Sequence, residues 1–202
     1  MPCWSNTDTS TFFSFPGSSG GIDEWVVFGN SLTSNEASGC PDGTDVVRAF
    51  TFGYASNALD PSVSGPGAAM TLAFYHDPDG VAGVDFAGLG GSPVPLDPSH
   101  LAAQFTFTGL PGASIPGTSV PSWVITLDLA ASDAEFALRD DGRVPGAFAF
   151  SWVFDQFATG PLLCYAGNGF GGPDGNGMVD AFDWYSPPAY SGGSLLGTFF
   201  LG

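Results

Sequence analysis

Residues 147–155 read Ala-Phe-Ala-Phe-Ser-Trp-Val-Phe-Asp, which places aromatic side chains at alternate positions: Phe148, Phe150, Trp152 and Phe154. A period of two is the period of a β-strand, in which successive side chains point to opposite faces of the sheet. Residues 122–130 repeat the pattern with one apolar stripe, formed by Trp123, Ile125, Leu127 and Leu129. Both stripes predict strands whose apolar faces line the interior between two sheets.

Seven further segments have strand-like patterns bounded by Gly, Pro and Asp clusters, namely 11–15, 22–28, 46–54, 69–76, 102–108, 135–139 and 195–201. Nine short strands without helical periodicity predict an all-β fold. We expect a two-sheet antiparallel β-sandwich, jelly-roll-like or immunoglobulin-like, with few or no helices. The dipeptide Asp141-Gly142 predicts a hairpin turn between the strands at 135–139 and 147–155.

The chain is expected to form one domain over residues 1–202, because a single β-sandwich of this length is ordinary. The Gly- and Pro-rich stretch 80–99 is predicted to be a loop within that domain, since strand patterning resumes directly after it. Residues 160–194 form a second loop-rich region in the C-terminal part. Long loops on a rigid sandwich are where binding residues usually lie.

The chain is strongly acidic, with a net charge of −17 and no lysine; its only basic side chains besides two histidines are Arg48, Arg139 and Arg143. Of its 20 acidic residues, 17 are Asp and 3 are Glu. Asp favours turns and metal sites, whereas Glu and Lys are typical of exposed helices. The charge repels phosphate backbones and anionic membranes, so it argues against nucleic acid and lipid head groups as partners and favours cations.

Only 11% of the residues are charged whereas 44% are hydrophobic. The surface is therefore coated by Ser, Thr and Gly, or part of it is covered by a partner. No run of 18 apolar residues is present, which argues against a membrane-spanning helix. No signal peptide precedes Met1, so an exported protein would be seen here in its processed form.

Three cysteines permit one disulfide. Cys3 lies in the N-terminal arm and Cys40 in the turn sequence Gly-Cys-Pro-Asp-Gly, so we predict that they form a disulfide in an oxidising compartment. Cys164, between Leu163 and Tyr165, is expected to be a buried small hydrophobe. Zinc is disfavoured, because no Cys-x-x-Cys spacing occurs and neither histidine has a paired neighbour in the sequence.

Residues 172–183 match the twelve-residue calcium loop of dockerins and EF-hands, with Gly177 at the sixth position, where a sharp turn is needed. Ligand positions three, five, seven, nine and twelve fall on Asp174, Asn176, Met178, Asp180 and Asp183. The first position is Gly172 rather than an acid, and Pro187 and Pro188 leave room for barely one turn of an exiting helix. The alternative is an ordinary tight turn, which uses the same residue types.

Asp77, Asp79 and Asp85 are candidate ligands of a second cation site, with His76 adding a nitrogen ligand. The sequence Asp-Pro-Asp-Gly over 77–80 is also a favourable turn, and we consider the turn the better interpretation.

The sequence offers two other candidate sites, one for sugar binding and one for hydrolysis. Trp184, Tyr185 and Tyr190 are candidates for stacking on sugar rings, although tail aromatics more often pack over a sheet edge. A hydrolase would need two carboxylates, for which the candidates are Glu24 with Glu135 or Asp155, but acidic β proteins offer such pairs by chance. His100 is interpreted as a solvated loop histidine, so no catalytic residue is assigned.

The overall pattern is similar to that of uncharacterised secreted proteins of planctomycete-type bacteria. The segments that carry this resemblance are 50–54 (FTFGY), 160–167 (GPLLCYAG), 180–188 (DAFDWYSPP) and 197–200 (GTFF). The resemblance implies export and a β-rich fold, it implies no activity, and relatives are expected to continue beyond Gly202.

Together these observations predict a non-catalytic structural or adhesive module, extracellular or at the bacterial cell surface. We expect it to be stabilised by calcium and to self-assemble into a fibre or surface layer, because no lysine protects its open sheet edges. The alternatives are a carbohydrate-binding module and a polysaccharide-active hydrolase.

Overall fold

The structure is a computed structural model that describes residues 12–14, 24–30, 44–76, 98–115, 121–139, 147–154, 159–164, 181–185 and 195–200. These residues form twelve strands and two short 3-10 turns, Pro98–His100 and Ala130–Ser132. None of the helical segments among them is long and apolar enough to span a membrane.

All of the strand pairs are antiparallel, and the strands lie in three sheets. The first sheet has the order β1 (Phe12–Ser14), β10 (Thr159–Cys164), β4 (Ala49–Ser56) and β7 (Ser122–Asp128). The second has the order β12 (Leu195–Phe200), β11 (Ala181–Tyr185), β2 (Glu24–Asn30), β9 (Ala147–Phe154), β5 (Ala68–His76) and β6 (Leu101–Leu110). The third pairs β3 (Thr44–Val47) with β8 (Phe136–Arg139).

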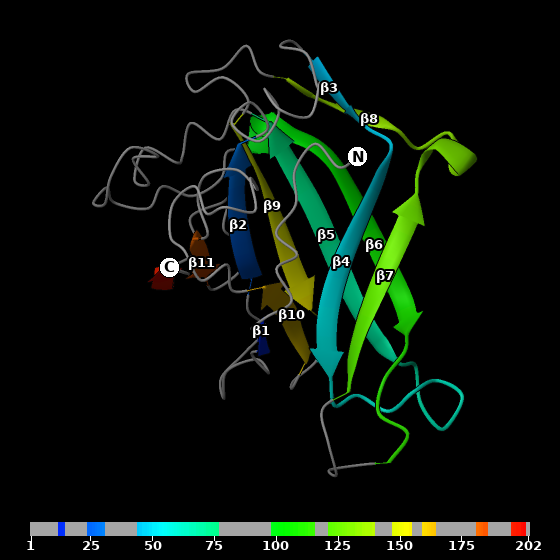
Figure 1. The fold of residues 1–202 in the computed structure, drawn as a ribbon. Helices are drawn as coiled ribbons and strands as arrows, with labels where there is room; N and C mark the ends of the chain where they lie inside the picture. Colours follow the sequence, from blue (N-terminus) through cyan, green and yellow to red (C-terminus); the bar gives the residue numbers. More distant parts are fainter. Residues whose placement is uncertain are drawn as a thin grey trace.

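The two large sheets pack face to face as a sandwich, with β4 and β7 in front of β5 and β6 in Figure 1 and the β3–β8 ribbon at the upper end. The four strands β1-β10-β4-β7 face the four strands β2-β9-β5-β6. This is the order of a jelly roll, in which eight strands form two Greek keys. The predicted all-β antiparallel sandwich is therefore confirmed, and of its two variants the strand order is that of the jelly roll.

The predicted stripe on β9 forms the centre of the core. Phe148, Phe150 and Trp152 are buried, and the ring of Trp152 meets that of Phe150 edge-on at 4.9 Å. The opposite face of β9 is buried too, at Ala149 and Ser151. A strand buried on both faces lies in the middle of its sheet, as β9 does between β2 and β5.

Aromatic rings join the two sheets across the sandwich. Phe50 of β4 lies 5.1 Å from Phe74 of β5 and 5.4 Å from Phe105 of β6, measured between ring centroids. Phe136 of β8 approaches Phe74 to 4.9 Å and so extends the same cluster to the upper end. Each such pair adds about 0.5–1.5 kcal/mol beyond the burial of its area.

The outer faces of the sheets carry hydroxyl side chains. The hydroxyls of Thr51 and Thr126 lie 2.8 Å apart on the first sheet, and those of Thr71 and Thr106 lie 3.4 Å apart on the second. Cross-strand Thr pairs of this kind stabilise a sheet. They also supply the Ser and Thr coat that the low content of charged residues requires.

The strand prediction was wrong in three places. The expected hairpin between 135–139 and 147–155 is not formed, because β8 pairs with β3 and β9 pairs with β2 and β5. Seven residues with a proline separate β8 from β9, too many for the two-residue turn that Asp141-Gly142 predicts. Two strands absent from the predicted set, β10 and β11, lie within or at the border of the loop-rich region 160–194. The single strand expected at 46–54 is divided at Arg48 into β3 and β4.

Candidate functional site

Strand β7 is an edge strand of the first sheet, and among the described strands it pairs only with β4. Its seven residues, Ser-Trp-Val-Ile-Thr-Leu-Asp, contain no Lys, Arg or Pro, and the one charge, Asp128, is at the end. The register with β4 is regular from Ala49 opposite Asp128 to Ala55 opposite Ser122. Natural sheets usually protect edges with charges, prolines or bulges, so β7 is an unprotected edge.

Strand β6 is the edge of the second sheet on the same flank of the sandwich, and it is protected. Its register with β5 shifts twice, between Ala68 and Met70 and between Phe74 and Tyr75. In both places the extra residue belongs to β6, and the first shift includes Gly109, whose φ of +65° favours glycine. Bulges of this kind bend an edge away from foreign strands.

The side chains of β7 alternate strictly between the two faces. Trp123, Ile125 and Leu127 are partly buried against the core, as predicted, while Ser122, Thr126 and Asp128 are exposed. Val124 lies among the exposed side chains with 71% of its surface accessible, the largest value for a large hydrophobic residue in the described part of the chain. The outer face of the edge therefore presents an apolar side chain between two hydroxyls.

Two loops meet at the lower end of the sandwich, next to the start of β7 (Figure 1). The carboxylate of Asp60 joins them: its Oδ1 accepts hydrogen bonds from the backbone N–H of Ser62 at 2.9 Å and from the Ser62 hydroxyl, and its Oδ2 accepts one from the N–H of Gly112 at 3.2 Å. These bonds, first those from Ser62, lower the pKa of Asp60. The anionic form of Asp60 therefore holds the two loops together.

Backbone hydrogen bonds support the same junction. The N–H of Ala113 donates to the carbonyl of Ala58 at 2.7 Å, and the N–H of Asp60 donates to the carbonyl of Ala113 at 3.0 Å. The loops approach so closely at Gly112 that a Cβ atom there would lie 2.2 Å from the carbonyl oxygen of Ala58. Glycine is required at this position because the backbones touch.

A pocket of about 380 Å³ opens at this junction. Its lining includes Asp60, Ser62, Ser114, Pro121 and Trp123, and two exposed apolar side chains, Val63 and Ile115, lie at its border with 52% and 59% of their surfaces accessible. The indole Nε1 of Trp123 is buried and has no hydrogen-bond partner among the described residues. The pocket thus combines a carboxylate, hydroxyls and an aromatic ring, the groups that contact polar organic ligands.

The two histidines have no paired neighbour in the sequence, but the fold brings them together. His76 ends β5, His100 directly precedes β6, and their rings stack with centroids 6.0 Å apart. Twenty-three residues lie between them in the sequence, so it is the pairing of β5 with β6 that brings them together. Asp77, Asp79 and Asp85, proposed as ligands beside His76, lie outside the described residues.

Most of the predicted calcium loop also lies outside the described residues, including Asp174, Asn176, Met178 and Asp180. Asp183, at the last loop position, lies in β11, opposite Val26 of β2 and Thr198 of β12. The chain therefore leaves the loop as a β-strand rather than as the helix of an EF-hand. The calcium site stays a prediction.

Two of the three candidate sugar-stacking residues, Trp184 and Tyr185, are in β11, while Tyr190 is outside the described residues. The register sets Trp184 opposite Trp25, and Trp25 opposite Trp152. The predicted disulfide between Cys3 and Cys40 lies outside the described residues and stays a prediction, and Cys164 lies in β10 opposite Phe12.

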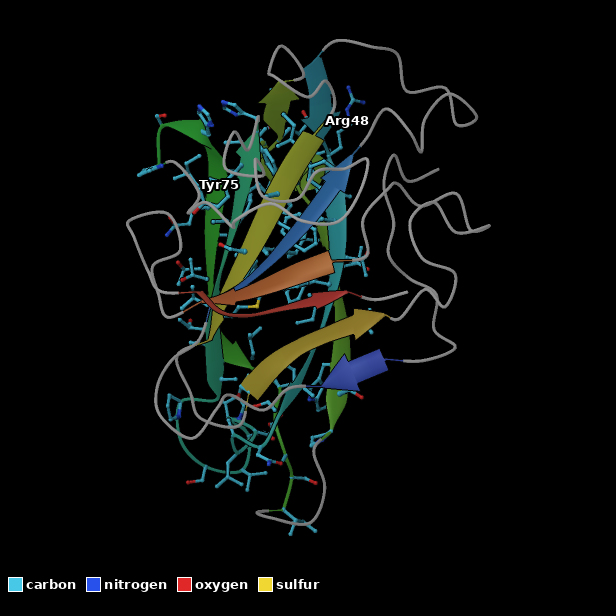
Figure 2. The ribbon with its side chains drawn as sticks, turned by 90° about the vertical axis from the view of Figure 1, so that its left-hand side faces the viewer. Arg48 and Tyr75 are labelled. Atoms are coloured by element: carbon cyan, nitrogen blue, oxygen red, sulfur yellow. The ribbon has the colours of Figure 1, made fainter. Side chains whose placement is uncertain are left out.

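The carboxylates considered for a hydrolase are not grouped by the described part of the structure. Glu135 forms an ion pair with Arg48, with 3.2 Å between Glu135 Oε1 and Arg48 Nε, and Arg48 lies at the upper end of the sandwich (Figure 2). Glu24 lies in β2 opposite Tyr185 and Val153. Asp155 is outside the described residues. Within the described ranges, no three side chains of His, Cys, Asp or Glu form a group that could hold a metal ion.

Comparison with protein-family models, with curated proteins and with solved structures finds no significant match to this chain.

Proposed function

We propose that the protein is a non-catalytic structural or adhesive module, extracellular or at the cell surface, that associates with copies of itself through the edge of β7. The observation that carries the proposal is the regular, unprotected edge of Ser122–Asp128 beside a β6 edge that two bulges protect. A jelly roll serves both assembling shell proteins and lectins, so the fold itself does not choose between functions.

The pairing of two β7 edges follows from their sequence. In an antiparallel pair centred on Ile125, Val124 of one copy meets Thr126 of the other, and Asp128 meets Ser122. The two Asp128 carboxylates then lie at opposite ends of the new pair, so like charges do not oppose each other directly. The contact joins two four-stranded sheets into one continuous sheet and is isologous, the kind of contact that a two-fold axis produces.

The net charge of −17 opposes association and gives it a salt dependence. Salt screens repulsion between exposed charges, since the Debye length falls from about 30 Å at 0.01 M to about 3 Å at 1 M. Association through an uncharged edge is therefore expected to strengthen as salt rises, whereas association through surface ion pairs would weaken. Calcium, proposed to bind at 172–183, would also strengthen association, because it neutralises carboxylates.

The test is sedimentation velocity on Val124→Lys and on the control Thr108→Lys, which adds the same charge to the exposed face of the protected strand β6. A lysine reduces the net negative charge, so a general charge effect would strengthen association in both variants. If the copies associate through β7, a lysine on that edge blocks strand pairing, so association should weaken at least about tenfold in Val124→Lys and not in Thr108→Lys. A wild-type protein that stays monomeric at high salt, or equal association in the two variants, would refute the proposal.

A second candidate function, carbohydrate binding, is favoured by the pocket at Asp60 and Trp123 rather than by the aromatic residues of the tail. Sugar-binding sites combine a carboxylate, which accepts hydrogen bonds from sugar hydroxyls, with an indole ring, whose apolar face packs against a pyranose ring. Titration with a panel of glycans tests it, with Ile115→Arg as the variant that obstructs the pocket. Binding that survives this substitution would exclude the pocket as the site.

A further inference from the structure

His76 and His100, the chain's only two histidines, occupy adjacent positions of neighbouring strands. Tyr75 pairs with Leu101 at the end of the β5–β6 register, and the two histidines are the next residues along each chain. Tyr75 marks this part of β5 in Figure 2. Directly opposite residues of an antiparallel pair have Cβ atoms about 4.5–5.5 Å apart on the same face, so the backbone itself holds the two imidazoles together.

The geometry of the rings suits two ligands of one metal ion. Their centroids are 6.0 Å apart and their planes differ by 27°. With metal–nitrogen distances of about 2.0–2.1 Å and a tetrahedral angle, two bound imidazoles have centroids roughly 5 Å apart. A small rotation about the side-chain bonds of either histidine covers the difference.

A second observation comes from the ring nitrogens. Nδ1 of His100 is buried and has no hydrogen-bond partner among the described residues. A buried polar atom normally has a partner, and an imidazole nitrogen without one is a site where an ion or a second-shell group is expected.

We propose that His76 and His100 bind a divalent transition metal of the zinc class. Imidazole nitrogen suits Zn²⁺, Co²⁺, Ni²⁺ and Cu²⁺, whereas Ca²⁺ takes oxygen ligands. The net charge of −17 attracts cations to any such site. The site is distinct from the calcium loop proposed at 172–183, and the two differ in the metal that they select.

The experiment uses the full chain with its free thiols alkylated, because thiolates also bind zinc. Zinc and calcium are titrated separately into wild type, His76→Ala, His100→Ala and the control Gln104→Ala, an exposed residue of β6. Zinc affinity is expected to fall at least about tenfold in each histidine variant and to stay unchanged in the control. Any calcium response should be the same in all four proteins.

A second measurement on the wild type alone covers the case in which a histidine variant fails to fold. The electron paramagnetic resonance spectrum of bound Cu²⁺ counts its nitrogen ligands, and two imidazole nitrogens are expected. Fewer than two imidazole nitrogens, or zinc affinity that is equal in wild type and in a folded His100→Ala protein, would overturn the proposal.

Discussion

The hydroxyl of Tyr54 donates a hydrogen bond of 2.8 Å to the carbonyl oxygen of Pro111, 57 residues later in the chain. Tyr54 is fully buried at the lower end of β4, and Pro111 lies just before Gly112 at the junction of the two loops. Burial raises the pKa of Tyr54 well above its ordinary value, and the negative charge of Asp60 raises it further. One phenol therefore connects the core to the loops that form the pocket.

Replacing Tyr54 by Phe is expected to lower the free energy of unfolding by about 0.5–1.5 kcal/mol, since it removes one hydrogen bond from a buried place. Thr51→Val is the matched control, because it removes a hydroxyl of the same strand from an exposed position. Chemical denaturation of both variants measures the effect. Equal losses would show that the Tyr54 hydroxyl contributes no more than a surface hydroxyl does.

Two glycine substitutions separate steric conflict from backbone strain. Gly112→Ala forces a Cβ atom to within 2.2 Å of the Ala58 carbonyl oxygen and is expected to cost about 1–3 kcal/mol or more. At Gly65 there is nothing within 4 Å, but φ is +87°, so Gly65→Ala is expected to cost only about 1–2 kcal/mol of conformational strain. Thermal denaturation compares them. A Gly112→Ala protein as stable as wild type would contradict the close approach of the two loops.

The buried hydroxyls of Ser56 and Thr159 lie 2.7 Å apart and link β4 to β10. Thr159→Val and Ser56→Ala are each expected to cost about 1–3 kcal/mol, because each leaves one buried hydroxyl or amide without its partner. The double variant should cost less than the sum of the two, by roughly 0.5–3 kcal/mol. A double-mutant cycle in denaturant measures this difference, and strict additivity would mean that the two hydroxyls do not interact.

The pKa of Asp60 is lowered from its ordinary value of 3.8, so its ionised form stabilises the fold. This contribution is complete above pH 3.8 and disappears as the pH falls through the lower pKa of the folded state. Asp60→Asn is therefore expected to melt at a lower temperature than wild type at neutral pH, with the gap closing in acid. If the difference in melting temperature were the same at every pH, the loss of stability in Asp60→Asn would not come from the charge of Asp60.

Calcium is expected to raise the melting temperature through the loop at 172–183, because an ion that binds only the folded state stabilises it by mass action. The response should be lost in Asp174→Ala and in Asp180→Ala, and kept in Asp77→Ala if the second candidate site is only a turn. The midpoint is compared in millimolar calcium and in excess EDTA. Identical midpoints in wild type would leave residues 172–183 as an ordinary turn.

The fold was predictable where the pattern is local. Alternation over 147–154 identified β9 and its core face, and alternation over 122–130 identified β7. Strand β10 was missed because Gly160 and Pro161 weaken a strand pattern, although Pro161 is tolerated opposite Tyr54. Strand β11 was missed because its five residues lie in a tail rich in Gly, Pro and Asp, residue types that indicate turns.

The candidate sites depended still more on long-range pairing. The absence of lysine pointed to unprotected edges, but not to which strand is an edge. That distinction needs the order of the sheets and the two bulges of β6. In the same way His76 and His100 appear unrelated in the sequence, because nothing local indicates that β5 and β6 are neighbours. The pocket at Asp60 likewise joins residues about fifty positions apart.

The jelly-roll order also determines when the chain can fold. Strand β1 pairs with β10, and β2 pairs with β9 and β11, so β1 and β2 complete their pairing only after synthesis has passed residue 185. Proteins with pairings of such long sequence separation fold slowly, in milliseconds to seconds. The reason is that a long loop must close, at a cost in chain entropy, before its stabilising contacts can form. During that interval β7 can already pair with β4, because both strands end before residue 129 and do not need β9, β10 or β11 for their pairing. The edge proposed for association would then exist before the rest of the sandwich closes, and assembly and folding would compete for the same strand.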